Sequence, residues 1–230
     1  MNLMEKEDLV KVKAEELETA SPQEIIAWAV ETFPNITFAC SFGAEDVVLV
    51  DMLRKISTTA DIFYLDTDFH FKETYETRDK LAEHYNIDFV RVSPKLTPEE
   101  QAKEHGDQLW LSDPNACCNI RKVEPLTRVL SNYEAWITGI RRDQAPTRAN
   151  AKKVEYDYKF GLIKFNPIAD WTTEDVWNYI RENEIIYNPL HDQNFPSIGC
   201  EYCTRAVMPG EDPRAGRWAN SEKTECGLHK

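Results

Sequence analysis

Four of the six cysteines form two closely spaced pairs, and this spacing is typical of a metal site. Cys117 and Cys118 are adjacent, while Cys200 and Cys203 form a Cys-x-x-Cys pair. Four thiolates can hold one tetrahedral zinc ion or one iron–sulfur cubane. Spacing leaves both open, although a redox role would also explain a further thiol in the tail. Adjacent side chains diverge on a regular backbone, so this pair should lie at a chain irregularity.

The remaining cysteines differ in their surroundings. Cys226 lies in the polar tail TECGLHK, which has no apolar run to bury it, so its thiol is expected to be accessible and easily oxidised. Its neighbour Glu225 disfavours the thiolate, whereas His229 and nearby arginines favour it. Cys40 ends an apolar segment and is expected to be a small buried core residue.

Arginines gather in two loop-like segments of the second half, TGIRRDQAPTR and DPRAGRW. Most arginines in proteins are solvated. Two clusters beside a cysteine site could nevertheless hold phosphate or sulfate through charge-assisted, bidentate hydrogen bonds. The candidates are Arg141, Arg142, Arg148, Arg214 and Arg217.

Composition limits the classes of function. The net charge of -13 opposes binding to nucleic acid or to anionic membrane surfaces. No apolar segment approaches the roughly 18 residues that would suggest a membrane span. The N-terminal segment is charged and lacks a secretory signal, so we expect a cytoplasmic protein.

Strands and helices alternate along the first half of the chain. Buried strands are expected at 36–40, 61–66 and 88–92, with helices at 45–56 and 72–85 between them. This alternation predicts an α/β fold, a mostly parallel sheet with helices on both faces.

Further elements are expected beyond residue 93. Helices should occupy 98–105, 119–130 and 171–183, a strand 135–139, and edge strands 159–168. We therefore divide one domain into N-terminal helices (1–34), a nucleotide-binding α/β part (35–187) and an irregular C-terminal segment that carries Cys200, Cys203 and Cys226 (188–230).

Two polar segments follow the first two expected strands. Ser41–Ala44 forms the loop SFGA between a strand and a helix, where backbone N–H groups suit a phosphate, although an ordinary connection has the same pattern. Asp66 and Asp68 follow the second strand and could bind a ribose or an amine, or cap the next helix.

Seven motifs in order resemble one enzyme family. The chain is similar to the thioredoxin-dependent adenylylsulfate reductases of sulfate assimilation, sisters of the phosphoadenylylsulfate reductases, from about Phe38 to His229. The motifs are SFGAEDVVL, YLDTDFHFKETYE, NACCNIRKVEPL, ITGIRRDQAPTRA, YNPLHDQNFPSIGCEYCTRAV, DPRAGRWA and KTECGLH.

The resemblance implies a fold like that of the adenine nucleotide alpha hydrolases and a reaction in two steps. Cys226 would attack the sulfur of adenylylsulfate, leaving an S-sulfocysteine that reduced thioredoxin, or a glutaredoxin-like donor, resolves to sulfite. A 4Fe-4S cluster would be bound by Cys117, Cys118, Cys200 and Cys203. Substrate would be bound by Ser41, Phe42, Gly43, Ala44, Asp66, Lys122, Arg148, Arg214 and Arg217.

Other functions stay open from the sequence. The substrate could be 3'-phosphoadenylylsulfate, or both nucleotides. An ATP-dependent adenylating or sulfur-transfer enzyme with structural zinc is a more distant alternative, because SFGAED departs from the Ser-Gly-Gly-x-Asp-Ser pyrophosphate loop of that wider fold. A metal-stabilised binding module would leave Cys226 without a purpose. The pattern does not decide whether the chain forms a homo-oligomer.

Overall fold

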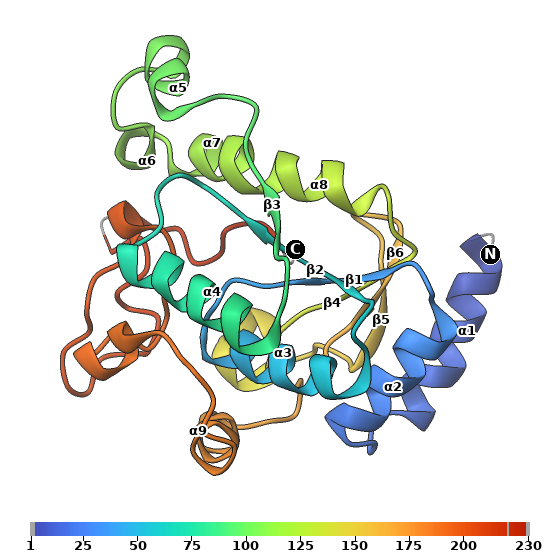
Figure 1. Cartoon of the computed structure of the whole chain (residues 1–230). Coiled ribbons are helices and arrows are strands. Elements are labelled where there is room, and N and C mark those ends of the chain that lie inside the picture. The colour runs from blue at the N-terminus through green and yellow to red at the C-terminus, as the bar shows by residue number, and fades with distance from the viewer. Residues whose placement is uncertain (1–2, 220, 229–230) are drawn as a thin grey trace.

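Six strands form one sheet in the order β3-β2-β1-β4-β6-β5 (Figure 1). The computed structural model describes residues 3–219 and 221–228. The strands are β1 (Ile36–Ala39), β2 (Asp61–Leu65), β3 (Val90–Val92), β4 (Ala135–Ile137), β5 (Val154–Asp157) and β6 (Leu162–Phe165). Neighbouring strands run parallel except β5, which pairs antiparallel with β6. The predicted α/β fold with a mostly parallel sheet is confirmed.

The strands expected at the edge take different places. β6 lies inside the sheet because it pairs with β4 as well as β5, and only β5 forms that edge. All four residues of β6 are buried, as expected for a strand covered on both faces. The segment LIKF is therefore a central strand rather than an edge strand.

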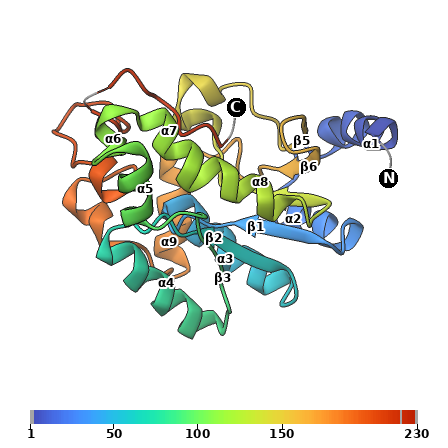
Figure 2. The same cartoon turned by 90° about the horizontal axis from the view of Figure 1, so that it is seen from above.

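Helices cover both faces of the sheet (Figures 1 and 2). They are α1 (Leu3–Glu16), α2 (Pro22–Thr32), α3 (Ala44–Ile56), α4 (Lys72–Tyr85), α5 (Pro98–His105), α6 (Leu109–Ser112), α7 (Pro114–Cys118), α8 (Glu124–Leu130) and α9 (Thr173–Glu182). Ser21, Thr97 and Thr172 each close a capping box that satisfies the first N–H groups of α2, α5 and α9. No helix among the described residues is long and apolar enough to cross a membrane.

Alternate residues of the buried strands contact different helices. Ile62 and Tyr64 of β2 pack in the larger core with the apolar residues of α2, α3 and α9. Phe63, between them, packs instead with Leu126 and Leu130 of α8. Because successive side chains of a strand point to opposite faces, one strand joins both layers.

The helix expected over 119–130 is interrupted. Residues Asn119–Val123 form one π-helical turn, η1, between α7 and α8. Asp113 caps the preceding helix by accepting hydrogen bonds from the N–H groups of Asn115 and Ala116. The expected irregularity at the adjacent cysteines is confirmed, and π-helical turns occur frequently at functional sites.

The C-terminal segment wraps around the domain with little regular structure. Its described part contains the short 3-10 turns η4 (Pro189–Gln193) and η5 (Glu201–Cys203). Single β-bridges join His70 to Cys200 and Thr204 to Arg217. These bridges bring the Cys-x-x-Cys pair to the segment that follows β2.

Candidate active site

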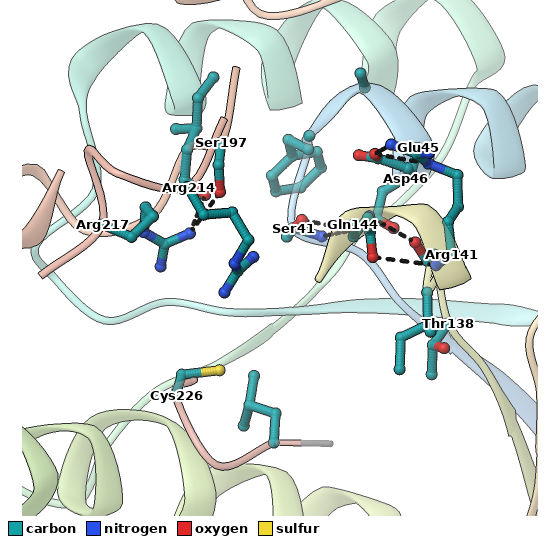
Figure 3. A pocket seen from close by; sticks show the side chains of 18 of the residues that line it. Ser41, Glu45, Asp46, Thr138, Arg141, Gln144, Ser197, Arg214, Arg217 and Cys226 are labelled. Atoms are coloured by element: carbon teal, nitrogen blue, oxygen red, sulfur yellow. Dashed lines mark hydrogen bonds and ion pairs between the residues drawn. The ribbon is translucent and has the colours of Figure 1, made fainter. Parts of the chain in front are cut away.

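A pocket of about 580 Å³ opens at the carboxyl edge of the sheet. Its walls include the loop after β1, the segment after β4, α9 and the C-terminal tail (Figure 3). Ligands of open α/β sheets bind at this edge, and the volume suits a nucleotide-sized molecule. The described tail thus contributes directly to the pocket.

The SFGA loop presents the start of α3 to this pocket. Phe42 has a φ of 61°, a left-handed conformation that is costly for a bulky residue, and its ring is held against Tyr64 and Phe89. Gly43 is the N-cap of α3 and makes no side-chain cap. The first N–H groups of α3 are therefore available to an anion, which the helix dipole also favours.

Asp46, in the first turn of α3, fixes the conformation of this loop through hydrogen bonds. Its Oδ2 accepts hydrogen bonds of 2.6 Å from the N–H and from the hydroxyl of Ser41. Burial raises the pKa of Asp46 to about 6, although the bonds from Ser41 oppose the shift. A Cβ on Gly139 would lie 2.1 Å from Asp46 Oδ1, so only glycine fits there.

Several cations of the pocket are already paired with protein groups. Arg141 is bound by Glu45 at 2.8 Å and by Asp143 at 3.3 Å. Arg142 donates to Glu18 and to the carbonyl of Ala151. Both arginines support the loop after β4 and have little capacity left for a ligand.

Three other cations lie near the tail. Lys122 lines both the main pocket and a smaller cavity bordered by cysteines. Burial lowers the pKa of Lys122, but the nearby Cys200 and Cys226 raise it more, so the net shift is upward. Arg217 is held by Ser197 and the carbonyl of Ile198, while its Nε is buried without a partner among the described residues. Arg214 lines the same wall.

Cys226 is brought into the same pocket by the returning tail. Figure 3 shows its sulfur directed into the pocket, on the side where Arg214 and Arg217 lie. Leu228 packs against the cluster that contains Phe63 and Trp136, and Lys159 Nζ donates to the carbonyl of Gly227. The thiol is partly buried rather than frayed. His229, expected to favour the thiolate, lies outside the described residues.

The four paired cysteines border the smaller cavity together. Cys117 and Cys118 come from the end of α7, and Cys200 and Cys203 come from η5 and the residue before it. No group of three or more His, Cys, Asp or Glu side chains within residues 3–219 and 221–228 has an arrangement that could hold a metal ion. The structure nevertheless brings both cysteine pairs to one place.

The surroundings of this cavity suit an anionic group bound by thiolates. Arg121 is 1% exposed, and its Nε and Nη2 have no partner among the described residues. Its Nη1 donates to the carbonyl of Thr67 and to Asp68, and its guanidinium stacks on Phe69. A buried guanidinium with two unpartnered nitrogens fits a negatively charged group, because buried donors without an acceptor are costly.

Asp66 is placed differently from the other candidates. It is buried and does not appear among the residues that line the pocket. It accepts hydrogen bonds from Arg91 Nε at 2.6 Å, from the hydroxyl of Tyr75 at 2.7 Å and from the N–H of Asp68. Its visible role is to fasten β3 and α4 to the end of β2.

Sequence reasoning missed several residues of the pocket. His70 is half-buried, lines the pocket and hydrogen-bonds through Nε2 to the carbonyl of Leu65. Gln144, Trp177 and Ser197 also line it. Gln144 and Ser197 lie within the motifs ITGIRRDQAPTRA and YNPLHDQNFPSIGCEYCTRAV, although no role was predicted for them, whereas Trp177 of α9 lies outside the seven motifs.

Comparisons with known proteins agree with this architecture. The model of the phosphoadenosine phosphosulfate reductase domain matches residues 35–206. The chain belongs to this family. Relatives named adenosine 5'-phosphosulfate reductase include one from Shouchella clausii, 50% identical over 98% of this chain and 94% of its own. One from Bacillus subtilis is 49% identical over 90% and 89%.

Solved structures place the fold. A phosphoadenylyl-sulfate reductase of Candida auris, crystallised with phosphate, is 35% identical, with a TM-score of 0.76 over 86% of this chain and 96% of that one. The FMN adenylyltransferase of Candida glabrata has a TM-score of 0.55 at 17% identity, covering 100% and 87%, and shows the fold alone. The predicted adenine nucleotide alpha hydrolase-like fold is confirmed.

Proposed function

We propose that this protein reduces adenylylsulfate to sulfite and AMP, with reduced thioredoxin as the electron donor. One observation carries the proposal: a free thiol, Cys226, lies in a nucleotide-sized pocket beside Lys122, Arg214 and Arg217. The names of relatives about half identical to this chain agree with that substrate. The reaction therefore combines a nucleophile with a site for anions.

In the first step the Cys226 thiolate attacks the sulfur of the phosphosulfate. A bond forms between Sγ and that sulfur, and the bond from sulfur to the phosphate oxygen breaks, so AMP leaves with the electron pair. Lys122 and Arg217 stabilise the negative charge that gathers on the departing phosphate. The N–H groups at the start of α3, which begins at Ala44 of the Ser41–Ala44 loop, bind the phosphate of the nucleotide.

In the second step a thiolate of reduced thioredoxin attacks Cys226 Sγ. The sulfur–sulfur bond of the adduct breaks, and sulfite leaves with the electron pair. The second thioredoxin thiol then resolves the mixed disulfide, so thioredoxin is oxidised and Cys226 is restored. A tail nucleophile suits this sequence because two partners must reach one sulfur in turn. The need for a reduced dithiol is consistent with the cytoplasm.

We assign a 4Fe-4S cluster to Cys117, Cys118, Cys200 and Cys203. Support comes from their shared cavity and from the buried Arg121 beside it. When bound, the cluster supplies a structural centre and an electrostatic influence next to the phosphosulfate, since the electrons of the reaction come from a dithiol. Lys122 and Trp218 line both cavities, so the two sites are adjacent.

The second candidate substrate is the 3'-phosphorylated nucleotide. The Candida auris structure, a phosphoadenylyl-sulfate reductase 35% identical to this chain, keeps it open. The relatives nearer 50% identity carry the unphosphorylated name and favour adenylylsulfate. Comparing kcat/KM for the two nucleotides decides between them.

The direct test is a sulfite assay on protein purified without oxygen, with adenylylsulfate and reduced thioredoxin. We expect sulfite and AMP in equal amounts, and iron with acid-labile sulfide in the protein. Zinc in place of iron would contradict the cluster assignment. Absence of sulfite from protein that contains the cluster and binds the nucleotide would contradict the reaction.

A further inference from the structure

Glu225 is a buried carboxylate immediately before the candidate nucleophile. It is 7% exposed, and its hydrogen-bond partners include two arginines that line the pocket. Arg148 Nε donates to its Oε1 at 2.9 Å, and Arg148 Nη2 donates to its Oε2 at 2.8 Å. Arg214 Nη2 lies 3.3 Å from Oε2, and the hydroxyl of Thr147 donates to Oε1 at 3.1 Å. Two candidate substrate arginines are thus bound by the protein's own tail.

Arg148 has no free nitrogen for a second anion in this arrangement. Two nitrogens form the bidentate pair with Glu225, and the third, Nη1, donates to Gln144 at 2.6 Å. Lys122 and Arg217 differ, because Arg217 Nε has no partner within the described part of the chain and Lys122 donates no hydrogen bond there. Of these four cations, Arg148 and Arg214 are the two that are paired with a carboxylate among the described residues.

A carboxylate and a sulfate or phosphate present similar pairs of oxygens to a guanidinium. From this geometry we propose that Glu225 occupies part of the substrate's anion site in the free protein and that the phosphosulfate displaces it from Arg148 and Arg214. The inference rests on the proposed function for the identity of that anion. Displacement releases the segment that carries Cys226 only when the pocket contains its ligand.

The charges of Glu225 and of the phosphosulfate favour replacement of one by the other at Arg148 and Arg214 over simultaneous binding of both. Glu225 is ionised near neutral pH, because the hydrogen bonds and charge of Arg148 lower its pKa against the raising effect of burial. A phosphosulfate bound beside Glu225 would bring further negative charges to the same two guanidinium groups. Negative charges that share one binding site repel each other. The tail carboxylate must therefore move when the anion arrives.

The first experiment needs no nucleotide. The rate at which iodoacetamide alkylates Cys226 is measured by peptide mass spectrometry. Three forms of the cluster-containing protein are compared: the wild type, Glu225→Gln and the control Glu222→Gln. Glu222 is an exposed carboxylate of the same tail, so its variant matches the change in charge. Plateau rates at high pH are compared, because there the degree of thiol ionisation no longer differs between variants.

We expect Cys226 of Glu225→Gln to be alkylated about 10- to 100-fold faster than Cys226 of the wild type. This range corresponds to the free energy of a lost hydrogen bond to a charged group. Inorganic sulfate should accelerate alkylation of the wild type and of Glu222→Gln but not of Glu225→Gln. Equal plateau rates in all three proteins, or sulfate that protects the wild-type thiol, would overturn the inference.

The second experiment measures adenylylsulfate binding by calorimetry in the Cys226→Ser background, where no adduct forms. Adding Glu225→Gln removes the competing carboxylate, so the nucleotide should bind about tenfold more tightly. Equal or weaker binding would mean that Glu225 does not compete. If adenylylsulfate fails to bind either protein, the proposed function fails, whereas the alkylation and sulfate results still judge the role of Glu225.

Discussion

Asp46→Asn should make the protein more stable, by an amount that grows with pH. Asp46 is 6% exposed, and burial raises its pKa from 3.8 to about 6. The folded state therefore binds this proton more tightly than the unfolded state does. The neutral Asp46 carboxyl therefore contributes fully to stability below about pH 3.8, and this contribution is lost as the pH rises through about 6.

The size of the effect follows from the shift. Each pKa unit corresponds to about 1.36 kcal/mol, so the ionised carboxylate costs the fold about 3 kcal/mol above neutral pH. Asparagine has the same shape, and its carbonyl oxygen can accept both hydrogen bonds that Ser41 now donates to Oδ2. For a chain of this length about 3 kcal/mol corresponds to a rise in Tm of roughly 6–12 °C.

Thermal unfolding without nucleotide, followed by circular dichroism at pH 5.5 and pH 7.5, measures this difference. Asp107→Asn is the control, because Asp107 is exposed and the chemical change is the same. We expect a higher Tm for Asp46→Asn at both pH values, with the larger gain at pH 7.5, and no gain for the control. An unchanged or lower Tm at pH 7.5, or a gain independent of pH, would refute the reasoning.

Three further substitutions test the site and its supports. Gly139→Ala places a Cβ 2.1 Å from Asp46 Oδ1, so it should lower stability by about 1–3 kcal/mol, seen as a lower Tm; an unchanged Tm would contradict the close approach. Thr172→Ala removes the capping box of α9 and should cost about 1 kcal/mol in urea unfolding, and no change would mean that the cap adds nothing. Cys203→Ser should lower the iron and acid-labile sulfide per chain, and full retention of both would remove Cys203 from the cluster ligands.

The sequence predicted the fold closely where local signals and burial agree. The boundaries of α4 and α5 match the expected ranges. The place of β6 was not predictable, because an apolar strand is buried both in the middle of a sheet and beside a covered edge. Only its pairing with β4 decides this.

The site residues likewise include some that the sequence predicted and some that it did not. Motif residues such as Lys122, Arg217 and Cys226 meet in one pocket, although they come from distant segments. Asp66 follows β2 as expected, but its bonds to Arg91 and Tyr75 depend on β3 and α4, which its own motif does not describe. Glu225 and Arg148 lie 77 positions apart in the sequence, so their contact could be recognised only in the folded structure.

The central claim, that Cys226 takes up the sulfonate group of adenylylsulfate, is tested most directly by mass spectrometry of the protein after one turnover without thioredoxin. We predict a mass increase of one SO₃ group on the peptide that contains Cys226, one AMP released per adduct, and loss of the adduct with release of sulfite when reduced thioredoxin is added. An adduct on a different cysteine, or sulfite formed by protein in which Cys226 is replaced by serine, would contradict it.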